Sequence, residues 1–569
     1  MLNLIPAVKS LELLSGFLNK KSVSYKEEAL TPRLARALSH LPSSDDGAPL
    51  SLSFENGEGE GYSIKISPDS VFISAESEAG AFYAVQTLRQ IFREEKVPCL
   101  VINDAPDFKY RGFSQDVSRG KVPTVESVKA LIDRMAYYKM NALQLYIEHT
   151  FDFPEVRELH EKTSCITGAE MRELDLYCKE NFIDFEPSLC TFGHMFEILN
   201  MEKFRHLRVL RDYENNHCRW FDRHNHHTID PTNDESIALV SSLIDSLGEN
   251  FTSDFINIGC DETFDLMKTY PPEVESKLYV DFVKKIIAKV KANGKRVMMW
   301  ADIVIEHPEC ISELPDDTIF LNWCYKKEPP VEKVRILSER KRPQIVCPST
   351  NSWLRFMESV DRAEGNIIKL LEHGYEHGAI GVLNTNWGDW GNTASMETAA
   401  YGFILGAAKS WSVATQPTPE FKGGVCDQIY GSENALEMLT RMSDLQNGVD
   451  VQRIFSAIHD HKEGISYNAP VSAEKLNATL NLYNELYPVI EGDEALNGKY
   501  KTAFLNALDG LTLTVEIGAA LSGYTFTPAV DLERFIARYS EAWLKDNKPS
   551  ELWRLVDLFR YGSSIINKA

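Results

Sequence analysis

The central part of the chain alternates short apolar runs with longer amphipathic stretches. Between about residues 106 and 412, eight runs stand out: 111–118, 142–149, 183–189, 255–262, 297–303, 319–325, 344–349 and 380–387. Sequences with helical spacing, such as VESVKALIDRMAYYKM and VDFVKKIIAKVKANG, separate most of them, and the link between the fifth and sixth runs is the weakest. Repeated strand–helix units predict an α/β fold with a (β/α)8 TIM barrel. A doubly wound open sheet is the structural alternative, although no GxGxxG or Walker sequence supports its usual nucleotide-binding use.

The segments on either side have other patterns. In residues 1–105, YSIKISPDSVFISAES alternates around a Pro-Asp turn like a hairpin, and EAGAFYAVQTLRQIFREE has helical spacing. This segment predicts a small N-terminal α+β domain. Residues 413–569 contain several amphipathic helical stretches, including AEKLNATLNLYNELYPVIEG. We therefore predict three domains, 1–105, 106–412 and 413–569, the last a helical C-terminal region that could cover the barrel or form a homodimer interface.

Charge narrows the choice of partners. The 569 residues carry a net charge of −23, which disfavours nucleic acid or an anionic membrane as the main partner. No stretch approaches 18 consecutive apolar residues, so no membrane span is expected, and the N-terminus lacks the pattern of a signal peptide. The ten cysteines show no regular spacing. We expect a cytoplasmic protein with reduced thiols.

Aromatic and acidic residues gather at the carboxyl ends of the apolar runs, where TIM barrels place their chemistry. In chain order these residues are Tyr146, Glu148, His149, Asp261, Glu262, Trp300, Asp302, Trp323, Tyr325, Trp353, Trp387, Asp389 and Trp390. Aromatic faces stack on the C–H faces of sugars, and carboxylates accept hydrogen bonds from sugar hydroxyls. The pattern predicts a sugar site, although any single tryptophan could instead fill the barrel interior.

The adjacent acids Asp261 and Glu262 suggest proton transfer. Two neighbouring carboxylates in a pocket of low dielectric constant do not both ionise readily, so one can hold a proton and act as a general acid. The alternative without catalysis is that the two acids form a polar strand end, at which Asp261 caps the next turn. Glu148 and His149 could in principle join the pair around a metal ion, but no HExxH or similar spacing accompanies them.

Four ordered motifs resemble glycoside hydrolase family 20, the β-N-acetylhexosaminidases. FINIGCDETFDL is similar to the family's strand-four signature, and YRGFSQDVSR to its strand-one motif, in which an arginine, here Arg111, reaches the sugar hydroxyls. FGHMFEIL resembles the family's Pro-Gly-His segment through His194, and NWGDWG its strand-eight motif through Trp387 and Asp389. The resemblance covers roughly residues 55–410, and the chain looks most like the cytosolic, single-chain branch.

The resemblance implies a retaining, substrate-assisted hydrolysis of terminal β-linked GlcNAc or GalNAc. The substrate's acetamido oxygen would attack the anomeric carbon and form an oxazolinium intermediate. Glu262 would be the general acid and base, and Asp261 would hold the acetamido N–H. Tryptophans such as Trp300, Trp323 and Trp387 would wall the acetamido pocket. No cofactor is expected.

The sequence departs from the family pattern in two places. Trp353 and Arg355 stand where the family has a Tyr-Leu-Asp stretch, so that Tyr325 could supply the hydroxyl to the acetamido oxygen instead. Phe192 replaces the proline of Pro-Gly-His.

One further stretch and two rival functions stay open. NHCRWFDRHNHHTID concentrates His217, Cys218, His224, His226 and His227 without paired metal-ligand spacing, so we expect no metal there. The rivals are a metal-dependent TIM-barrel hydrolase and a sugar-binding protein without activity. Sensitivity to EDTA would indicate the first, and sugar binding without cleavage the second.

Overall fold

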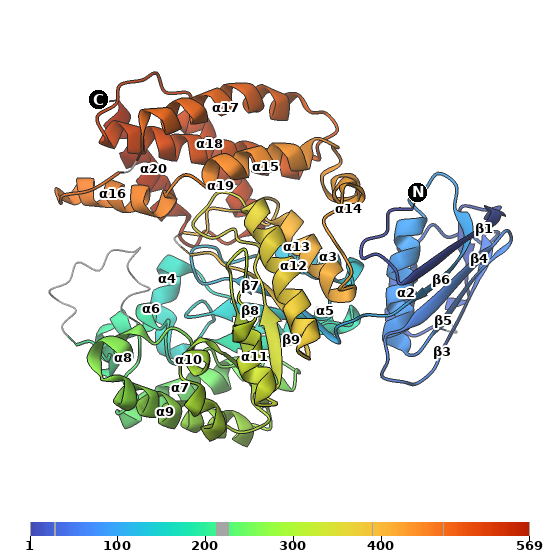
Figure 1. Cartoon of the computed structure of the whole chain (residues 1–569), viewed down its shortest axis with the longest axis horizontal. Helices are drawn as coiled ribbons and strands as arrows, with labels where there is room; N and C mark the ends of the chain where they lie inside the picture. Colours follow the sequence, from blue (N-terminus) through green and yellow to red (C-terminus); the bar gives the residue numbers. More distant parts are fainter. Residues whose placement is uncertain (1, 28–29, 212–226, 390, 470, 568–569) are drawn as a thin grey trace.

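The computed structural model describes residues 2–27, 30–211, 227–389, 391–469 and 471–567. Figure 1 shows the N-terminal sheet on one side of a central barrel and the C-terminal helices packed along another. The prediction of a TIM barrel with a small α+β domain and a helical C-terminal region is confirmed.

The N-terminal unit is a six-stranded sheet in the order β1-β6-β4-β5-β3-β2. The predicted hairpin pairs β4 (Tyr62–Ser67) with β5 (Ser70–Ala75) in antiparallel register, so that Ile64 lies opposite Ile73. The remaining elements are β1 (Ser10–Phe17), β2 (Val23–Ser24), α1 (Pro32–Leu38), β3 (Ala48–Phe54), α2 (Glu78–Ile91) and β6 (Pro98–Asp104). Helix α2 covers the sheet with a nearly continuous buried surface.

Eight parallel strands close the barrel in the order β10-β11-β12-β13-β14-β7-β8-β9. They are β7 (Tyr110–Asp116), β8 (Ala142–Ile147), β9 (Asp184–Leu189), β10 (Phe255–Asn257), β11 (Arg296–Trp300), β12 (Ile319–Trp323), β13 (Gln344–Cys347) and β14 (Gly381–Asn386). Each strand falls within one of the predicted apolar runs or overlaps it. Every residue of β8 is buried, as expected for a parallel strand covered on both faces.

The helices around the barrel follow from amphipathic sequence and from side-chain caps. The Thr167 hydroxyl accepts the Glu170 N–H while the Glu170 carboxylate accepts the Thr167 N–H, a capping box that starts α5. The long helices are α3 (Val125–Tyr137), α5 (Gly168–Glu180), α7 (Asp234–Gly248), α9 (Pro272–Ala292), α11 (Glu332–Glu339), α12 (Val360–Glu376) and α13 (Ala400–Trp411). The weak link between the fifth and sixth runs contains only α10 (Asp302–Glu306) and the 3-10 helix η6 (Pro308–Glu313).

Short helices lie in the loops at the carboxyl ends of the strands. They are η2 (Pro154–Leu159), α4 (His160–Thr163), α6 (Phe196–Asn200), η3 (Glu202–Leu207) and α8 (Phe264–Thr269). These loops follow β8, β9 and β10, and therefore the strand ends that carry the acidic residues.

The C-terminal region packs around one central helix, α18 (Gly498–Leu521). Its neighbours are α14 (Pro419–Val425), the π-helix η7 (Cys426–Tyr430), α15 (Ala435–Gln446), α16 (Val451–Glu463), α17 (Ala473–Gly492), α19 (Leu532–Asp546) and α20 (Leu552–Ile566). Helix α18 is long and apolar enough to cross a membrane by length and composition, but its apolar window is entirely buried among the other helices. It is thus the core of the bundle.

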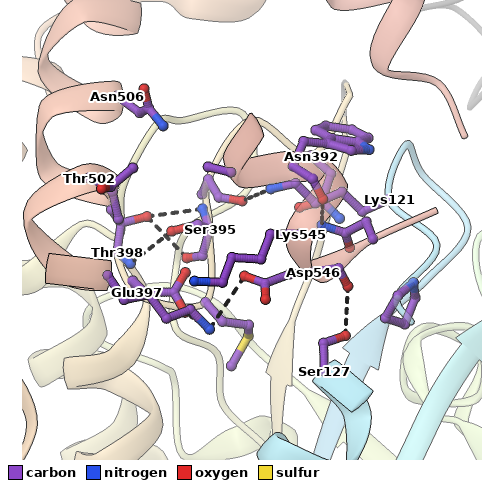
Figure 2. A pocket seen from close by; sticks show the side chains of 18 of the residues that line it. Lys121, Ser127, Asn392, Ser395, Glu397, Thr398, Thr502, Asn506, Lys545 and Asp546 are labelled. Carbon is purple, nitrogen blue, oxygen red and sulfur yellow. Dashed lines mark hydrogen bonds and ion pairs between the residues drawn. The ribbon is translucent and has the colours of Figure 1, made fainter. Parts of the chain in front are cut away.

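A cavity of about 330 Å³ separates this bundle from the barrel. The loop after β14 lines it with Ser395, Glu397 and Thr398, and α18 and α19 also line it, for example with Thr502 and Lys545 (Figure 2). Lys499 of α18 lies 2.9 Å from the Glu397 carboxylate, whose residue is only 5% exposed. Burial lowers the pKa of Lys121, at the same cavity, to about 8. The bundle therefore supports a loop that begins at the mouth of the barrel.

Candidate active site

A turn with unusual backbone angles presents the two acids at the end of β10. Gly259, Cys260 and Glu262 have φ angles of 68°, 69° and 48°, and the last two are costly for residues other than glycine. The Glu262 N–H donates to Asp302 Oδ2 at 2.9 Å, and the Tyr279 hydroxyl donates to the Cys260 carbonyl at 2.8 Å. These bonds hold the turn in place, so that Asp261 and Glu262 extend from the carboxyl end of the barrel.

His194 joins the two carboxylates. Its Nε2 lies 3.2 Å from Asp261 Oδ2 and 3.2 Å from Glu262 Oε2. The loop after β9 reaches this point because Gly193 has no side chain: a Cβ there would lie 2.3 Å from the Asp261 carbonyl oxygen. The His194 N–H donates to His227 Nδ1 at 2.8 Å, and the two imidazoles stack with centroids 4.7 Å apart.

The neighbours of His194 determine its protonation state. Burial alone would lower its pKa, but Asp261 and Glu262 outweigh burial and raise the pKa of His194 to about 10. Arg119 lies 3.1 Å from the other ring nitrogen, Nδ1, where a neutral imidazole would accept its hydrogen bond. In either protonation state Nε2 carries a hydrogen directed at the carboxylates, so His194 orients both acids.

Arg119 is the central cation of the site, and sequence reasoning missed it. Its guanidinium donates to Glu148 Oε1 at 3.0 Å and to Asp389 Oδ1 at 2.7 Å. It also lies 3.3 Å from Asp116 Oδ2, whose residue ends β7. Its side chain is 5% exposed and its charge lies over the Tyr146 ring. One arginine therefore organises carboxylates from three different strand ends.

The prediction that Arg111 contacts the sugar is wrong. Arg111 is the second residue of β7, at the amino end of the barrel, whereas the acids lie at the carboxyl ends. Its side chain is fully buried and donates to Glu60 Oε2 at 2.6 Å and to the Lys139 carbonyl at 2.8 Å. Arg111 therefore anchors the N-terminal unit to the barrel. Both arginines occur in the quoted strand-one motif, and only Arg119 follows the strand.

The predicted aromatic residues do come together. Trp300, Trp323, Tyr325, Trp353 and Trp387 form one cluster that also includes Tyr146. The Trp387 indole N–H donates to the Tyr325 hydroxyl at 2.7 Å, and the Trp323 and Tyr325 rings stack with centroids 5.0 Å apart. Trp353 meets the edge of Tyr325 at 5.2 Å. The cluster borders the acids through Tyr146, whose ring centroid lies 6.3 Å from that of His194.

Two further carboxyl groups have raised pKa values. Burial, followed by the charge of Asp261, raises the pKa of Asp302 to about 8. Burial raises the pKa of Asp389 to about 6, although Arg119 opposes this change. Asp302 is therefore protonated near neutral pH beside the Asp261 charge, while Asp389 remains the ionised partner of Arg119.

The other predicted positions have diverse roles. Glu148 accepts bonds from Arg119 and from the Tyr146 hydroxyl. Arg355 donates to Asn447 Oδ1 of the C-terminal bundle at 2.8 Å. Phe192 is buried and stacks on Tyr279 with centroids 5.6 Å apart. Of the histidine-rich stretch, His217, Cys218, His224 and His226 lie outside the described residues, as does Trp390.

Among the residues that the structure describes, the buried polar atoms without a hydrogen-bond partner include two in this site, Asp261 Oδ1 and Trp300 Nε1. Unpartnered polar atoms are costly to bury, so a carboxylate oxygen and an indole N–H in one site are ready for a ligand that supplies a donor and an acceptor. Within the same described residues, the side chains of His194, Asp261 and Glu262 also lie close enough together to surround a cation.

Two models of one protein family match the N-terminal unit and the barrel. The model of "Glycosyl hydrolase family 20, catalytic domain" matches residues 108–419, and that of "Glycosyl hydrolase family 20, domain 2" matches residues 1–105. A β-hexosaminidase of Vibrio furnissii is 24% identical over 302 residues, which are 46% of this chain and 48% of that protein. The chain thus spans about half or less of the length of the first curated relatives.

Solved structures share the fold. A family 20 exo-β-N-acetylglucosaminidase from Vibrio harveyi in complex with N-acetylglucosamine has a TM-score of 0.60 at 18% identity, covering 77% of this chain and 78% of its own. A chitobiase from Flavobacterium johnsoniae has a TM-score of 0.56 at 16% identity and covers 99% of both chains. At these identities the likeness establishes architecture, which in the second case includes the C-terminal helices.

Proposed function

Since the chain belongs to glycoside hydrolase family 20, we propose that it is a retaining exo-β-N-acetylhexosaminidase that uses the substrate's own acetamido group. The observation that carries the proposal is the convergence of Asp261 and Glu262 on His194 Nε2, at 3.2 Å each, beside the aromatic cluster. The proposed substrate is a glycan that ends in β-linked GlcNAc or GalNAc.

Glu262 is the proposed general acid and base. Its side chain is 32% exposed, more than the 11% of Asp261, so it is the acid that a glycosidic oxygen and then a water molecule can reach. Protonation of the leaving oxygen and later activation of water can be served by one group, because the second step reverses the proton transfer of the first.

Asp261 is the proposed partner of the acetamido group. Its Oδ2 faces His194, while the buried Oδ1 has no partner within the described part of the chain and can accept the acetamido N–H. The positive charge that develops on the oxazolinium ring would then lie beside a carboxylate held in a buried site, where the attraction is stronger than in water.

The other contacts divide between the two ends of the sugar. Trp300 Nε1 and the Tyr325 hydroxyl are candidate donors to the acetamido oxygen, and the rings of Trp323 and Trp387 would exclude water from it. Asp389, ionised against Arg119, is a candidate acceptor for sugar hydroxyls at the non-reducing end. The latter assignment replaces the contact expected from Arg111.

The rival proposal is a metal-dependent hydrolase, since His194, Asp261 and Glu262 could surround a cation. Arg119 lies 3.1 Å from Nδ1 of His194, and both acids approach Nε2, so a metal ion would have to displace the proton that the two acids favour on Nε2. This arrangement favours acid–base chemistry. Loss of activity in EDTA that returns with a divalent cation would instead support the metal enzyme.

The decisive experiment compares nitrophenyl glycosides. We expect the protein to hydrolyse the β-GlcNAc or β-GalNAc compound and to leave the β-glucoside intact, because the glucoside has no acetamido nucleophile. Glu262→Gln should lower kcat by about 10²–10⁴-fold, and a thiazoline mimic of the intermediate should inhibit the wild type tightly. Equal cleavage of the glucoside, or unchanged turnover in Glu262→Gln, would refute the proposal.

A further inference from the structure

A second group of ligand-type side chains lies in the loop after β8, outside the proposed catalytic residues. Asp152, His160 and Cys165 each offer one ligand atom, and these three atoms lie within 4.8 Å of one another. Asp152 Oδ1 is 3.6 Å from His160 Nδ1. A carboxylate oxygen, an imidazole nitrogen and a sulfur atom form a mixed donor set that suits zinc, whereas calcium and magnesium prefer oxygen ligands alone.

His160 gives the independent sign of a ligand. Its side chain is only 9% exposed, and neither ring nitrogen makes a well-aligned hydrogen bond within the residues that the structure describes, although the backbone of His149 and Phe151 lies close to the ring. A buried imidazole whose ring nitrogens lack well-aligned hydrogen bonds is costly unless something binds it.

The backbone holds the three residues together. The Asp152 N–H donates to the Ile166 carbonyl at 3.0 Å, and the Ile166 N–H donates to the Thr150 carbonyl at 2.8 Å. Residues 150–152 therefore run beside 165–166, while His160 begins the short helix α4 between them. These backbone bonds bring the three ligand residues into one part of the loop.

We propose that Asp152, His160 and Cys165 form a zinc site with a fourth position open to water. A bound ion would cross-link the loop that starts at Glu148 to the segment containing α4. Lys548 of the C-terminal region donates to the Cys165 carbonyl at 2.7 Å, so the ion would also brace that contact. Sequence spacing does not reveal this group, because the three residues are separated by 7 and 4 intervening residues in an irregular loop.

One neighbouring positive charge should weaken the binding of a metal ion, and its removal tests the proposal. Arg157 Nε lies 3.7 Å from Asp152 Oδ1, and its side chain is 71% exposed. A cation bound to Asp152 would be repelled by this guanidinium. Removing the positive charge in Arg157→Gln should tighten metal binding by roughly fivefold, and this exposed position carries little risk to folding.

The test uses Co²⁺ as a spectroscopic substitute for Zn²⁺ on the full-length protein after chelator treatment. We expect Co²⁺ to produce a thiolate-to-metal charge-transfer absorption that Zn²⁺ abolishes by competition. The absorption should be lost in Cys165→Ser, retained in Cys218→Ser and reached at lower Co²⁺ concentration in Arg157→Gln. Zn²⁺ should also raise the melting temperature of the wild type but not of Cys165→Ser.

The control at Cys218 separates this site from the histidine-rich stretch, which also contains a thiol. Loss of the absorption in Cys218→Ser with retention in Cys165→Ser would overturn the proposal. So would an absence of charge-transfer absorption in the wild type at saturating Co²⁺, or an unchanged affinity in Arg157→Gln. Ions held by His194, Asp261 and Glu262 would give no thiolate band, because that group contains no cysteine.

Discussion

Arg119 allows the organisation of the site to be tested by one substitution, Arg119→Met. The side chain lies within 3.3 Å of three carboxylates, those of Asp116, Glu148 and Asp389, whose side chains are 0%, 6% and 25% exposed. Methionine fills a similar volume but leaves these charges without their cation. Removing one partner of a buried ion pair costs about 3–5 kcal/mol. The three contacts share one cation and are not additive, so we expect a total loss of this size.

The assay is urea unfolding at pH 7.5 and at pH 5.5, with activity measured on the same samples. The uncompensated carboxylates of the variant can take up protons at lower pH, so its stability deficit should shrink at pH 5.5. The activity of Arg119→Met should fall by at least tenfold, because Asp389 and His194 lose the group that orients them.

The matched control is Arg111→Met, at the other end of the same strand. Arg111 is also fully buried and also pairs with a carboxylate, Glu60. This variant should lose stability while keeping kcat/KM within a few-fold of the wild type. The reasoning would be refuted if Arg119→Met lost less than about 1 kcal/mol, or if both variants lost activity equally.

Two other substitutions test the turn that carries the acids. Gly193→Ala should reduce kcat strongly, because a Cβ would lie 2.3 Å from the Asp261 carbonyl oxygen. The control is Gly248→Ala, where a Cβ has nothing within 4 Å, and this variant should keep full activity. Similar kinetics for the two variants would contradict the role of Gly193 in positioning the acids. Asp302→Asn tests proton binding by a buried acid whose pKa is raised to about 8. Above pH 4 this carboxyl group holds its proton in the folded state but not in the unfolded chain, so Asp302 contributes a fall in stability as the pH rises towards 8, of up to about 1.4 kcal/mol per unit. In urea unfolding, the stability of Asp302→Asn should therefore decline less steeply with pH than that of the wild type, and parallel pH profiles would exclude proton binding by Asp302.

Sequence was sufficient for the barrel because each of its strands is a compact apolar run. Where the pattern was weakest, between β11 and β12, the structure has only two short helices. The acids and the aromatic cluster were also predictable, since the carboxyl ends of parallel strands meet at one end of a barrel. The same rule selects Arg119, three residues after β7, over Arg111; motif resemblance alone does not distinguish the two arginines.

Other features of the site depend on contacts that no local pattern encodes. The left-handed φ angles of Cys260 and Glu262 are held by Tyr279 and Asp302, which belong to other elements. His227 reaches the site from the end of a long segment and meets His194 only in the folded chain. Pairing between residues distant in sequence is set by the assembled barrel, so a single sequence without aligned relatives does not reveal it.

The link between Glu397 and Lys499 has a practical meaning for anyone who shortens this protein. The segment that leaves β14 carries Trp387 and Asp389 at the mouth and then runs to Glu397, which is held by the central helix of the bundle. An expression clone ending near residue 412 would keep every proposed catalytic group. It would, however, lack the C-terminal helices against which that segment packs. Weak activity of such a shortened protein would be explained by the loss of the helices that support this segment. It would not be evidence against the proposed roles of Asp261 and Glu262.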